Sequence, residues 1–458
     1  MRGTSKYPIR PRPSALTKAY ACSIANVSTH SHGCSMASNP THLASFRLSN
    51  RQLSRGDLCE SLIGLRWERA ASDEIAHALM PDRYFPNPNY PDLPALTTED
   101  AFSELLVSLD RILTNYPPVI SDRQIAFHGF YYGPTSISFL FLALSSLFPD
   151  LVVKSNSLRH WSRAYLNISL SYDHRDPKPT NCGIANEKLT TLALTAILNH
   201  DDSSVQKLCS YVPKLLTQPG ERSYEWLYGL SGLLYLLRLC RSVPAQSTSI
   251  VESAIQDVIT CILTSRQPWM WHGKEYLGAV HGTIGIITQV ILSSSSPEIA
   301  KEVSLILSDL LATQLPSGNF PSSIPYTKDT LVQFCHGAPG FLISLRSLFP
   351  YFPDLSRQLT AAIRNGEKCI IERGILTKMP SLCHGVYGNS LGLRKSDMQR
   401  FLTLTCAGEP DRWGSKREEE EEDLDEMFGL FTGEGGRSWV MALAEKGEEG
   451  KMLGYNDL

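Results

Sequence analysis

The stretch HGAPGFLISLRSL, residues 336–348, places a pair of glycines directly before an apolar run. A related stretch, HGVYGNSLGL, occupies residues 384–393, and its first glycine lies 48 residues after the first glycine of the earlier copy. Glycine permits a tight turn and a close backbone approach where a helix begins. The pattern therefore indicates a repeating unit in which each glycine pair precedes a helix.

This glycine motif, in which a glycine stands at the start of a helical segment, occurs seven times along the chain. Its first glycines, spaced 46 to 55 residues apart, are Gly133, Gly183, Gly229, Gly282, Gly337, Gly385 and Gly433. A second glycine follows three residues later in five of the seven copies, and Ser136 and Asn186 take its place in the first two. A step near 50 residues holds two helices and two loops, so the sequence predicts seven helical hairpins.

Two architectures are open to seven helical hairpins. They can stack as an open solenoid, or they can close into a ring. In a closed ring, the apolar helices after the glycines would form an inner barrel. Amphipathic segments such as IVESAIQDVITCIL, residues 250–263, would form an outer barrel, because their apolar residues recur with the 3.6-residue period. The seven glycine turns would then surround one mouth of the barrel.

Three repeats place a histidine directly before the first glycine, namely His281, His336 and His384. Cys335 and Cys383 precede two of these histidines. Thiolate and imidazole together suit Zn²⁺, and a catalytic zinc needs three protein ligands and one open position. Four candidate ligands are present, and packing of the cysteines in the core is the alternative. His281 has no neighbouring cysteine and is available for proton transfer.

The composition describes a globular protein of 458 residues with 42% hydrophobic residues and a net charge of −3. This charge gives no reason to expect a nucleic acid as partner. No apolar run reaches the ~18–20 residues that span a bilayer, although peripheral membrane association is left open. Eleven cysteines, an odd number spread along the chain, favour a reducing compartment and predict a cytoplasmic protein.

The first 56 residues contain no Asp or Glu but eight Lys or Arg. They read as a mitochondrial presequence, as a disordered tail, or as sequence upstream of a true start at Met36 or Met80. We therefore expect residues 1–79 to be a basic N-terminal extension and residues 80–458 to form one domain. A genuine presequence would place the protein in mitochondria, and plasma-membrane association is a further alternative.

Residues 80–447 resemble the lanthionine synthetase C-like family, which comprises bacterial lantibiotic cyclases and eukaryotic LanC-like proteins. The resemblance rests on six segments in the same order and at similar spacing: RYFPNP (83–88), LGAVHGTIGI (277–286), SGNFP (317–321), FCHGAPG (334–340), GILTKMPSLCHGVYGN (374–389) and GLFTGEGG (429–436). The segments at 83–88 and 317–321 favour the eukaryotic branch.

The resemblance implies an all-α fold, an α,α-toroid with seven inner and seven outer helices. It also implies one zinc ion held by Cys335, Cys383 and His384, with His281 as the catalytic acid or base. His336 then becomes either a residue that supports the metal ligands or one that faces the substrate, rather than a ligand itself.

The resemblance further implies glutathione as co-substrate, with its carboxylates bound by Arg83 and Lys378. The expected reaction adds the glutathione thiol to dehydroalanine or dehydrobutyrine residues of peptides or proteins and forms a thioether. The chain departs from the family pattern at Phe334, where the family has Trp, and between residues 390 and 428, where an acidic run is inserted and the outer helix is expected to be short. Arg412 is the candidate for a further glutathione-binding arginine in this remodelled region.

Two alternatives differ in class from this enzyme. One is a LanC-like protein that binds zinc and glutathione and acts through protein partners without turnover. The other is a different α,α-barrel enzyme, such as a six-hairpin glycosidase or a zinc prenyltransferase. A glycosidase needs paired carboxylates near the barrel mouth, and the glycine turns offer only Glu187 and Glu434. A prenyltransferase uses a carboxylate ligand to zinc, which the two Cys-His-Gly triplets lack.

Overall fold

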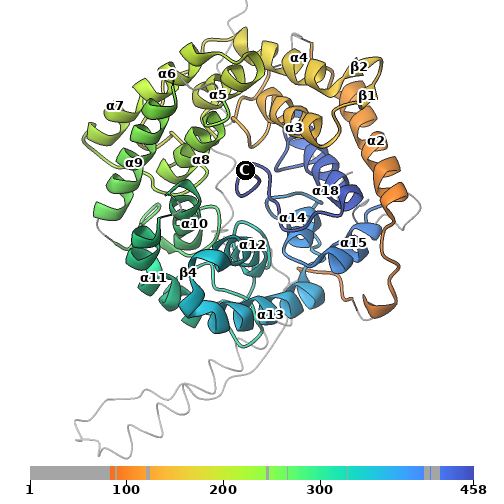
Figure 1. Ribbon diagram of the computed structural model, residues 1–458. Coiled ribbons are helices and arrows are strands. Elements are labelled where there is room, and N and C mark those ends of the chain that lie inside the picture. Colours follow the sequence, from red (N-terminus) through yellow and green to blue (C-terminus); the bar gives the residue numbers. More distant parts are fainter. Residues whose placement is uncertain are drawn as a thin grey trace, which may run out of the picture. The chain divides into compact units, whose positions relative to one another are not determined.

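The helices of the protein alternate between two concentric layers of a ring (Figure 1). The structure is a computed structural model that describes residues 83–87, 90–119, 124–243, 247–265, 267–294, 296–326, 328–406, 413 and 423–458. The expected N-terminal extension, residues 1–79, and Arg412 lie outside the described residues. Every described helix is too short or too polar to span a bilayer.

The inner layer consists of the helices that follow the glycine turns. They are α3 (Pro134–Leu147), α5 (Glu187–Asn199), α8 (Leu230–Cys240), α10 (Thr283–Ser294), α12 (Ala338–Leu348), α14 (Val386–Leu391) and α18 (Glu434–Lys446). These helices are apolar on nearly every side, and all residues of α8 are buried. A helix that is hydrophobic all round has to be enclosed by other elements, which explains its place in the inner layer.

The outer layer consists of the helices that precede each turn. They are α2 (Thr98–Asn115), α4 (Leu158–Leu170), α6 (Asp202–Ser210) with α7 (Val212–Thr217), α9 (Thr248–Thr264), α11 (Pro297–Ala312), α13 (Ser356–Arg373) and α15 (Lys395–Thr403). Each buries one stripe, as α9 does with Val251, Ile255, Val258 and Ile262. The short outer helix expected in the remodelled region is confirmed, because α15 has nine residues.

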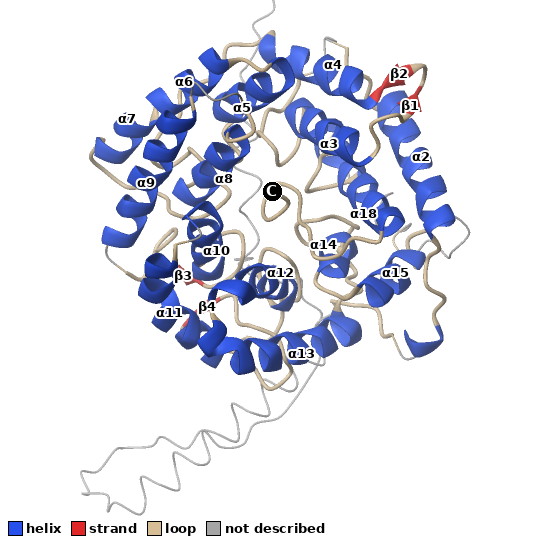
Figure 2. Ribbon diagram, viewed as in Figure 1, coloured by secondary structure: helices blue, strands red, loops and turns tan. Residues whose placement is uncertain are grey.

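Short elements connect the two layers (Figure 2). They are η2 (Tyr90–Asp92), β1 (Val152–Val153), β2 (Asn156–Ser157), β3 (Glu275–Tyr276), β4 (Ser323–Ile324), η3 (Phe349–Tyr351), η4 (Pro353–Leu355) and α17 (Leu424–Phe428). Strands β1 and β2 form one antiparallel pair. Strands β3 and β4 form another, with Tyr276 opposite Ser323, and this pair joins the loops that lead into α10 and α12.

The last helix closes the ring by packing on the first two. Helix α18 contacts α2 in the outer layer and both α3 and α14 in the inner layer, and the remaining inner helices contact their neighbours in sequence order. Figure 1 shows the blue C-terminal helix beside the orange N-terminal helices. The predicted all-α toroid is therefore confirmed, and the open solenoid is excluded.

Backbone hydrogen bonds join the turns of neighbouring repeats. We call the residue three positions before each inner helix the turn residue; the seven are Tyr131, Ile184, Leu227, Val280, Cys335, Cys383 and Phe431. The N–H of Phe130 donates to the carbonyl of the turn residue Ile184 at 2.9 Å, and the N–H of Trp226 donates to that of Val280 at 3.0 Å. Such bonds join six of the seven neighbouring pairs of turns, and we call the seven turns at this mouth of the ring the rim.

The prediction for Asn186 was wrong in detail. This residue does not replace the second glycine of its repeat; it caps α5, and its side-chain oxygen accepts a hydrogen bond from the N–H of Leu189 at 3.0 Å. Asn186 therefore stands where the other repeats place the first glycine, as Gly337 does before α12. Asparagine is among the best N-cap residues, so the change of residue preserves the start of the helix.

The C-terminal segment lies inside the ring (Figures 1 and 2). Tyr455 is fully buried, and its hydroxyl lies 2.7 Å from that of Ser344. The indole of Trp226 donates to the carbonyl of Gly454 at 3.0 Å. Tyr455 also packs edge-on against Phe334, at 5.4 Å between ring centroids. Because Phe334 precedes Cys335, this segment supports the rim from within.

The close packing at the second glycine of the repeated motif can be tested by measuring the stability of variants. A Cβ on Gly285 would overlap the carbonyl oxygen of Ala279, six residues earlier. We expect Gly285→Ala to lower the free energy of unfolding by about 3 kcal/mol, because the helix start must move away from the turn. In the first repeat, Ser136 fills the equivalent position and donates to the Gly133 carbonyl at 2.7 Å, so Ser136→Ala should cost only about 1 kcal/mol. Denaturant unfolding of both variants checks this difference, which equal losses would contradict.

Candidate metal centre

Three predicted side chains converge at the rim between α12 and α14. The candidate ligand atoms of Cys335, Cys383 and His384 all lie within 4.8 Å of one another. Both cysteines are buried, and His384 is half-buried. His336, the fourth candidate from the sequence, is not part of this group. The structure thus selects three of the four candidates left open by the residue pattern.

The rim explains why the two cysteines meet. Cys335 and Cys383 are the turn residues of neighbouring repeats, and the N–H of Cys335 donates to the carbonyl of Cys383 at 3.1 Å. The N–H of Cys383 in turn donates to the carbonyl of Phe431 at 3.0 Å. His384 follows Cys383 directly, so a single turn supplies two of the three side chains.

The two thiols interact with each other and with nearby donors. The hydrogen bond between them lowers the pKa of Cys383 well below its usual value and raises the pKa of Cys335. His384 also lowers the pKa of Cys383. The side-chain amide of Gln333 donates to the sulfur of Cys335 at 3.1 Å. The thiolate form is therefore favoured at Cys383, whereas the sulfur of Cys335 accepts a hydrogen bond from the amide of Gln333.

Tyr131 is a neighbour of this group that the sequence analysis missed. Burial raises the pKa of its phenol well above the usual range, and the neighbouring Cys383 and Cys335 add to this shift. Tyr131 is the turn residue of the first repeat, and its position in the repeat was the one feature of the sequence that could have identified it. The aromatic phrase FYYG, residues 130–133, looks like core packing when it is read without the ring closure.

The donor set fits a zinc ion. Two sulfurs and one imidazole nitrogen are the soft and borderline ligands that Zn²⁺ prefers, and three protein ligands leave a fourth position for water or substrate. The two cysteines would bind the metal as thiolates, so metal binding would release their protons.

His281 lies at the rim one repeat before Cys335 and is held by a buried glutamate. Its Nδ1 lies 2.8 Å from Oε2 of Glu225, which is 1% exposed. Its ring stacks on Trp271, with centroids 3.9 Å apart and planes 6° apart. Both contacts fix the ring, and the carboxylate favours the tautomer with the proton on Nδ1.

Glu225 is the second functional residue that the sequence analysis missed. Its carboxylate accepts hydrogen bonds from the N–H of Leu227 at 2.9 Å and from the N–H of Tyr228 at 2.6 Å. These donors fix the carboxylate toward His281. The sequence places Glu225 four residues before Gly229, but the repeat pattern alone does not indicate that it reaches the next turn.

His336 lies beside His281 at the same mouth. Its ring centroid is 5.9 Å from that of His281 and 5.4 Å from that of Tyr276. Its Nδ1 is buried without a hydrogen-bond partner. Burial lowers the pKa of His336 to about 3, with smaller contributions from His281 and Lys378, so the ring is neutral at physiological pH. A neutral, partly unsatisfied imidazole facing the rim is suited to contact a substrate.

Arg83 and Lys378 lie on adjoining extended segments. The N–H of Thr377 donates to the carbonyl of Arg83 at 3.0 Å, and the N–H of Phe85 donates to that of Ile375 at 2.7 Å. Both cations are exposed. The charge of Lys378 contributes to lowering the pKa of His336, which places this ammonium group near the rim. The structure therefore brings the backbones of the two predicted glutathione-binding residues close together and places the charge of Lys378 near Cys335 and His336.

The two acidic residues considered for a glycosidase have structural partners. The buried carboxylate of Glu187 accepts hydrogen bonds from the N–H of Gly129 at 2.7 Å and from the hydroxyl of Ser169 at 2.7 Å. Glu434 forms ion pairs with Arg437 at 3.3 Å and Arg111 at 3.7 Å. Because both carboxylates are engaged in separate networks, they do not form a glycosidase pair.

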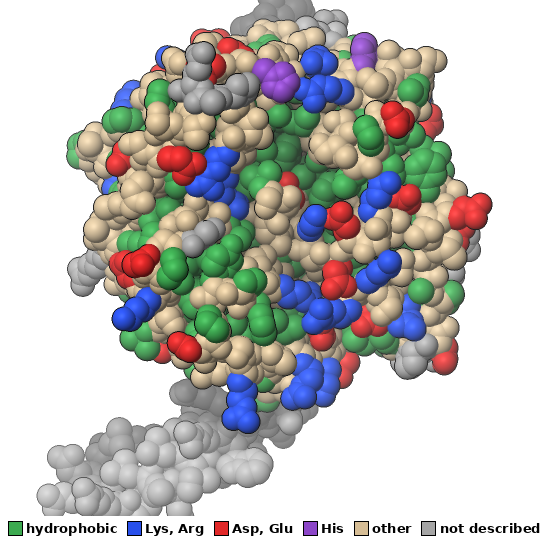
Figure 3. Space-filling view, viewed as in Figure 1, with side chains coloured by type: hydrophobic (Ala, Val, Ile, Leu, Met, Phe, Trp, Pro, Cys, Tyr) green, Lys and Arg blue, Asp and Glu red, His purple; other side chains and the backbone are tan. Residues whose placement is uncertain are grey.

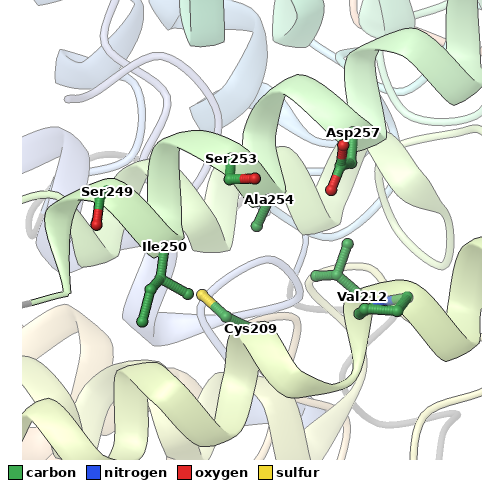
Figure 4. A pocket seen from close by; sticks show the side chains of 8 residues that line it. Cys209, Val212, Ser249, Ile250, Ser253, Ala254 and Asp257 are labelled. Carbon is green, nitrogen blue, oxygen red and sulfur yellow. The ribbon is translucent and has the colours of Figure 1, made fainter.

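A cavity of about 290 Å³ lies in the outer wall between α7 and α9 (Figure 4). Its lining includes Cys209, Val212, Ile250 and Asp257. Burial raises the pKa of Cys209 to about 11, so this thiol is unreactive at neutral pH. On the face of the molecule seen in Figure 3, basic and acidic side chains are interspersed. Neither this cavity nor this surface is as well suited to catalysis as the cysteine and histidine side chains at the rim.

Comparison with known proteins identifies the family. A family model described as lanthionine synthetase C-like protein matches residues 99–437. A Danio rerio protein named glutathione S-transferase LANCL1 is 29% identical over 322 residues, which cover 65% of this chain and 75% of that protein. The LanC-like protein GCL1 of Arabidopsis thaliana is 29% identical over 180 residues, 37% of this chain and 41% of that protein.

A solved structure supports the same fold. Nisin cyclase superimposes with a TM-score of 0.50 at 15% sequence identity, over 76% of this chain and 94% of its own. At this identity the likeness concerns the fold alone, and it agrees with the closed double ring of helices seen here. The family match covers six of the seven inner helices in full and the start of the seventh. The chain belongs to the lanthionine synthetase C-like family.

Proposed function

We propose that this protein is a zinc-dependent enzyme that adds the thiol of glutathione to dehydroalanine or dehydrobutyrine residues and forms a thioether. The observation that carries the proposal is the convergence of Cys335, Cys383 and His384 at the same mouth as the His281–Glu225 pair. The names of the relatives support it, since one is called a glutathione S-transferase and the other neighbour is a cyclase.

Cys335, Cys383 and His384 would hold the zinc. A zinc ion bound there would lower the pKa of a coordinated thiol, so that its thiolate is available at neutral pH. The buried position of both cysteines limits access of water to the ion. His336, with its neutral ring beside the site, would contact the substrate without adding charge.

His281 would carry out both proton transfers of the reaction. Nε2 of His281 accepts the proton of the glutathione thiol, and the thiolate forms a carbon–sulfur bond with the β-carbon of the acceptor while the double bond opens toward the α-carbon. The resulting enolate takes a proton from Nε2 of His281, because Nδ1 is engaged with Glu225. The buried carboxylate of Glu225 stabilises the imidazolium that exists between the two proton transfers. No leaving group is released, so the reaction is an addition.

Arg83 and Lys378 would bind the carboxylates of glutathione through charge-assisted hydrogen bonds. Glutathione is anionic, and both side chains are exposed. The aromatic side, formed by Trp271, Tyr276 and His281, remains for the uncharged dehydroamino acid. This arrangement lets the thiol and the acceptor approach from different sides.

The second prediction concerns proton transfer. We expect His281→Ala to lower the rate of glutathione addition to a dehydroalanine peptide about a hundredfold or more, with zinc retained, because a general acid is lost. Mass spectrometry of the product and elemental analysis of the protein check this together. His160→Ala, an exposed histidine on α4, is the matched control and should keep the rate. A His281→Ala protein with wild-type rate would remove His281 from the mechanism.

Turnover by the wild-type protein decides between the enzyme and the binding protein. A folded, zinc-containing protein that binds glutathione but leaves several dehydroalanine and dehydrobutyrine peptides unchanged would contradict catalysis and favour the binding protein.

The third prediction concerns the thiol. We expect Lys378→Ala to raise the dissociation constant for glutathione several-fold, because a charge-assisted contact to a carboxylate is lost. Lys368→Ala removes the same charge from an exposed position on α13 and should have no such effect. Cysteamine, a thiol without carboxylates, should bind both variants equally. Calorimetric titration measures each constant, and equal glutathione affinity in all three proteins would exclude Lys378 from the binding site.

A further inference from the structure

We propose that Gln333 is a positioning residue of the metal centre, whose side-chain amide donates a hydrogen bond to the sulfur of Cys335 and so orients this ligand and withdraws electron density from it. The inference rests on the proposed function, since it requires a metal at the group formed by Cys335, Cys383 and His384. The contact that carries it is direct, because Nε2 of Gln333 lies 3.1 Å from Sγ of Cys335.

Backbone hydrogen bonds hold Gln333 in place on both sides. Its own N–H donates to the carbonyl of His336 at 3.1 Å, which closes a tight turn around Cys335. The carbonyl of the preceding residue, Val332, accepts a hydrogen bond from the side-chain amide of Asn389 at 2.8 Å. Asn389 lies on α14, the helix that follows the neighbouring ligand turn. The amide donor is therefore fixed relative to its own ligand and to the other ligand turn.

Both partners of the contact are buried. Gln333 is 6% exposed and Cys335 is 7% exposed. A buried amide costs free energy unless it is hydrogen-bonded, and here the sulfur accepts from it. Because water has little access to the pair, the hydrogen bond is stronger than it would be at the surface. A buried, fixed donor of this kind is suited to orient a metal ligand.

The chemistry of the contact follows from the two groups. A carboxamide donates through its N–H₂ group and carries no charge, whereas a coordinating cysteine is a thiolate and accepts. A hydrogen bond to an ionised acceptor is stronger than one between neutral groups, so the amide favours the ligand form of Cys335. The same bond draws electron density from the sulfur and so reduces its donation to a bound metal.

Two substitutions of Gln333 separate the hydrogen bond from packing. Gln333→Met keeps the length of the side chain and removes the donor. Gln333→Glu keeps the shape of the side chain but places a carboxylate, which accepts and does not donate, against the sulfur. If the amide acts through its hydrogen bond, the glutamate should weaken metal binding more than the methionine, because it would repel the thiolate.

Gln314 provides the matched control. Its side-chain amide donates to the carbonyls of Gly318 and Ala362, each at 2.9 Å. Gln314→Met therefore removes an amide donor with at least as many hydrogen bonds as that of Gln333, but these bonds are to backbone carbonyls and not to a ligand. Circular dichroism and thermal unfolding establish that each variant is folded.

The experiment loads the wild-type protein and the variants with Co²⁺, which reports on thiolate ligands through sulfur-to-cobalt charge-transfer absorption. We expect this band to move to longer wavelength in Gln333→Met, because the sulfur of Cys335 becomes a stronger donor. We also expect the dissociation constant for zinc, measured by competition with a chromophoric chelator, to rise about tenfold in Gln333→Met and further in Gln333→Glu. Gln314→Met should match the wild type in both measurements.

The remaining outcomes would contradict the inference. An unchanged band and an unchanged zinc affinity in Gln333→Met, or wild-type zinc affinity in Gln333→Glu, would overturn it while leaving the metal site in place. Equal changes in Gln333→Met and Gln314→Met would overturn it too, because the effect would then be structural. A wild-type protein that takes up neither metal would overturn the inference together with the proposed function.

Discussion

Hydrogen bonds between the backbones of neighbouring turns are the interaction on which this structure depends. Each turn residue occupies the same place before its inner helix, and such bonds join six of the seven neighbouring pairs of turns around the mouth. At the remaining junction a glycine allows a close approach, because a Cβ on Gly278 would overlap the carbonyl oxygen of Cys335 in the next turn. A side chain placed at the rim therefore meets the side chain at the same place in the next repeat. Cys335 and Cys383 follow this rule, and Tyr131 follows it across the point where the ring closes.

The electrostatic organisation of the mouth follows from which rim positions are buried. Glu225 is buried, and its hydrogen bonds from backbone N–H groups allow it to hold His281. His336 is kept neutral by burial. The cations Arg83 and Lys378 remain exposed. Under the proposed function, these exposed charges would attract the anionic thiol, and the buried groups would act on the uncharged acceptor.

Much of the fold could be predicted because the glycine phrase repeats with a nearly constant step. The repeat predicts hairpins and equivalent turns, and hence the proximity of Cys335, Cys383 and His384, but closure of the ring became an expectation only through the family resemblance. Asn186 was misplaced because a capping side chain and a glycine both begin a helix, although by different means. Glu225 and Tyr131 were missed because their contacts depend on how far a side chain reaches into the neighbouring turn, which spacing along the chain does not specify.

The metal content of the purified protein tests the central claim most directly. The wild type and the variants Cys335→Ala, Cys383→Ala, His384→Ala and His336→Ala are to be compared by elemental analysis, with circular dichroism to establish that each is folded. The account predicts one zinc per chain in the wild type and in His336→Ala, and loss of zinc in the other three. A folded wild-type protein without zinc, or full zinc content in a cysteine variant, would contradict it.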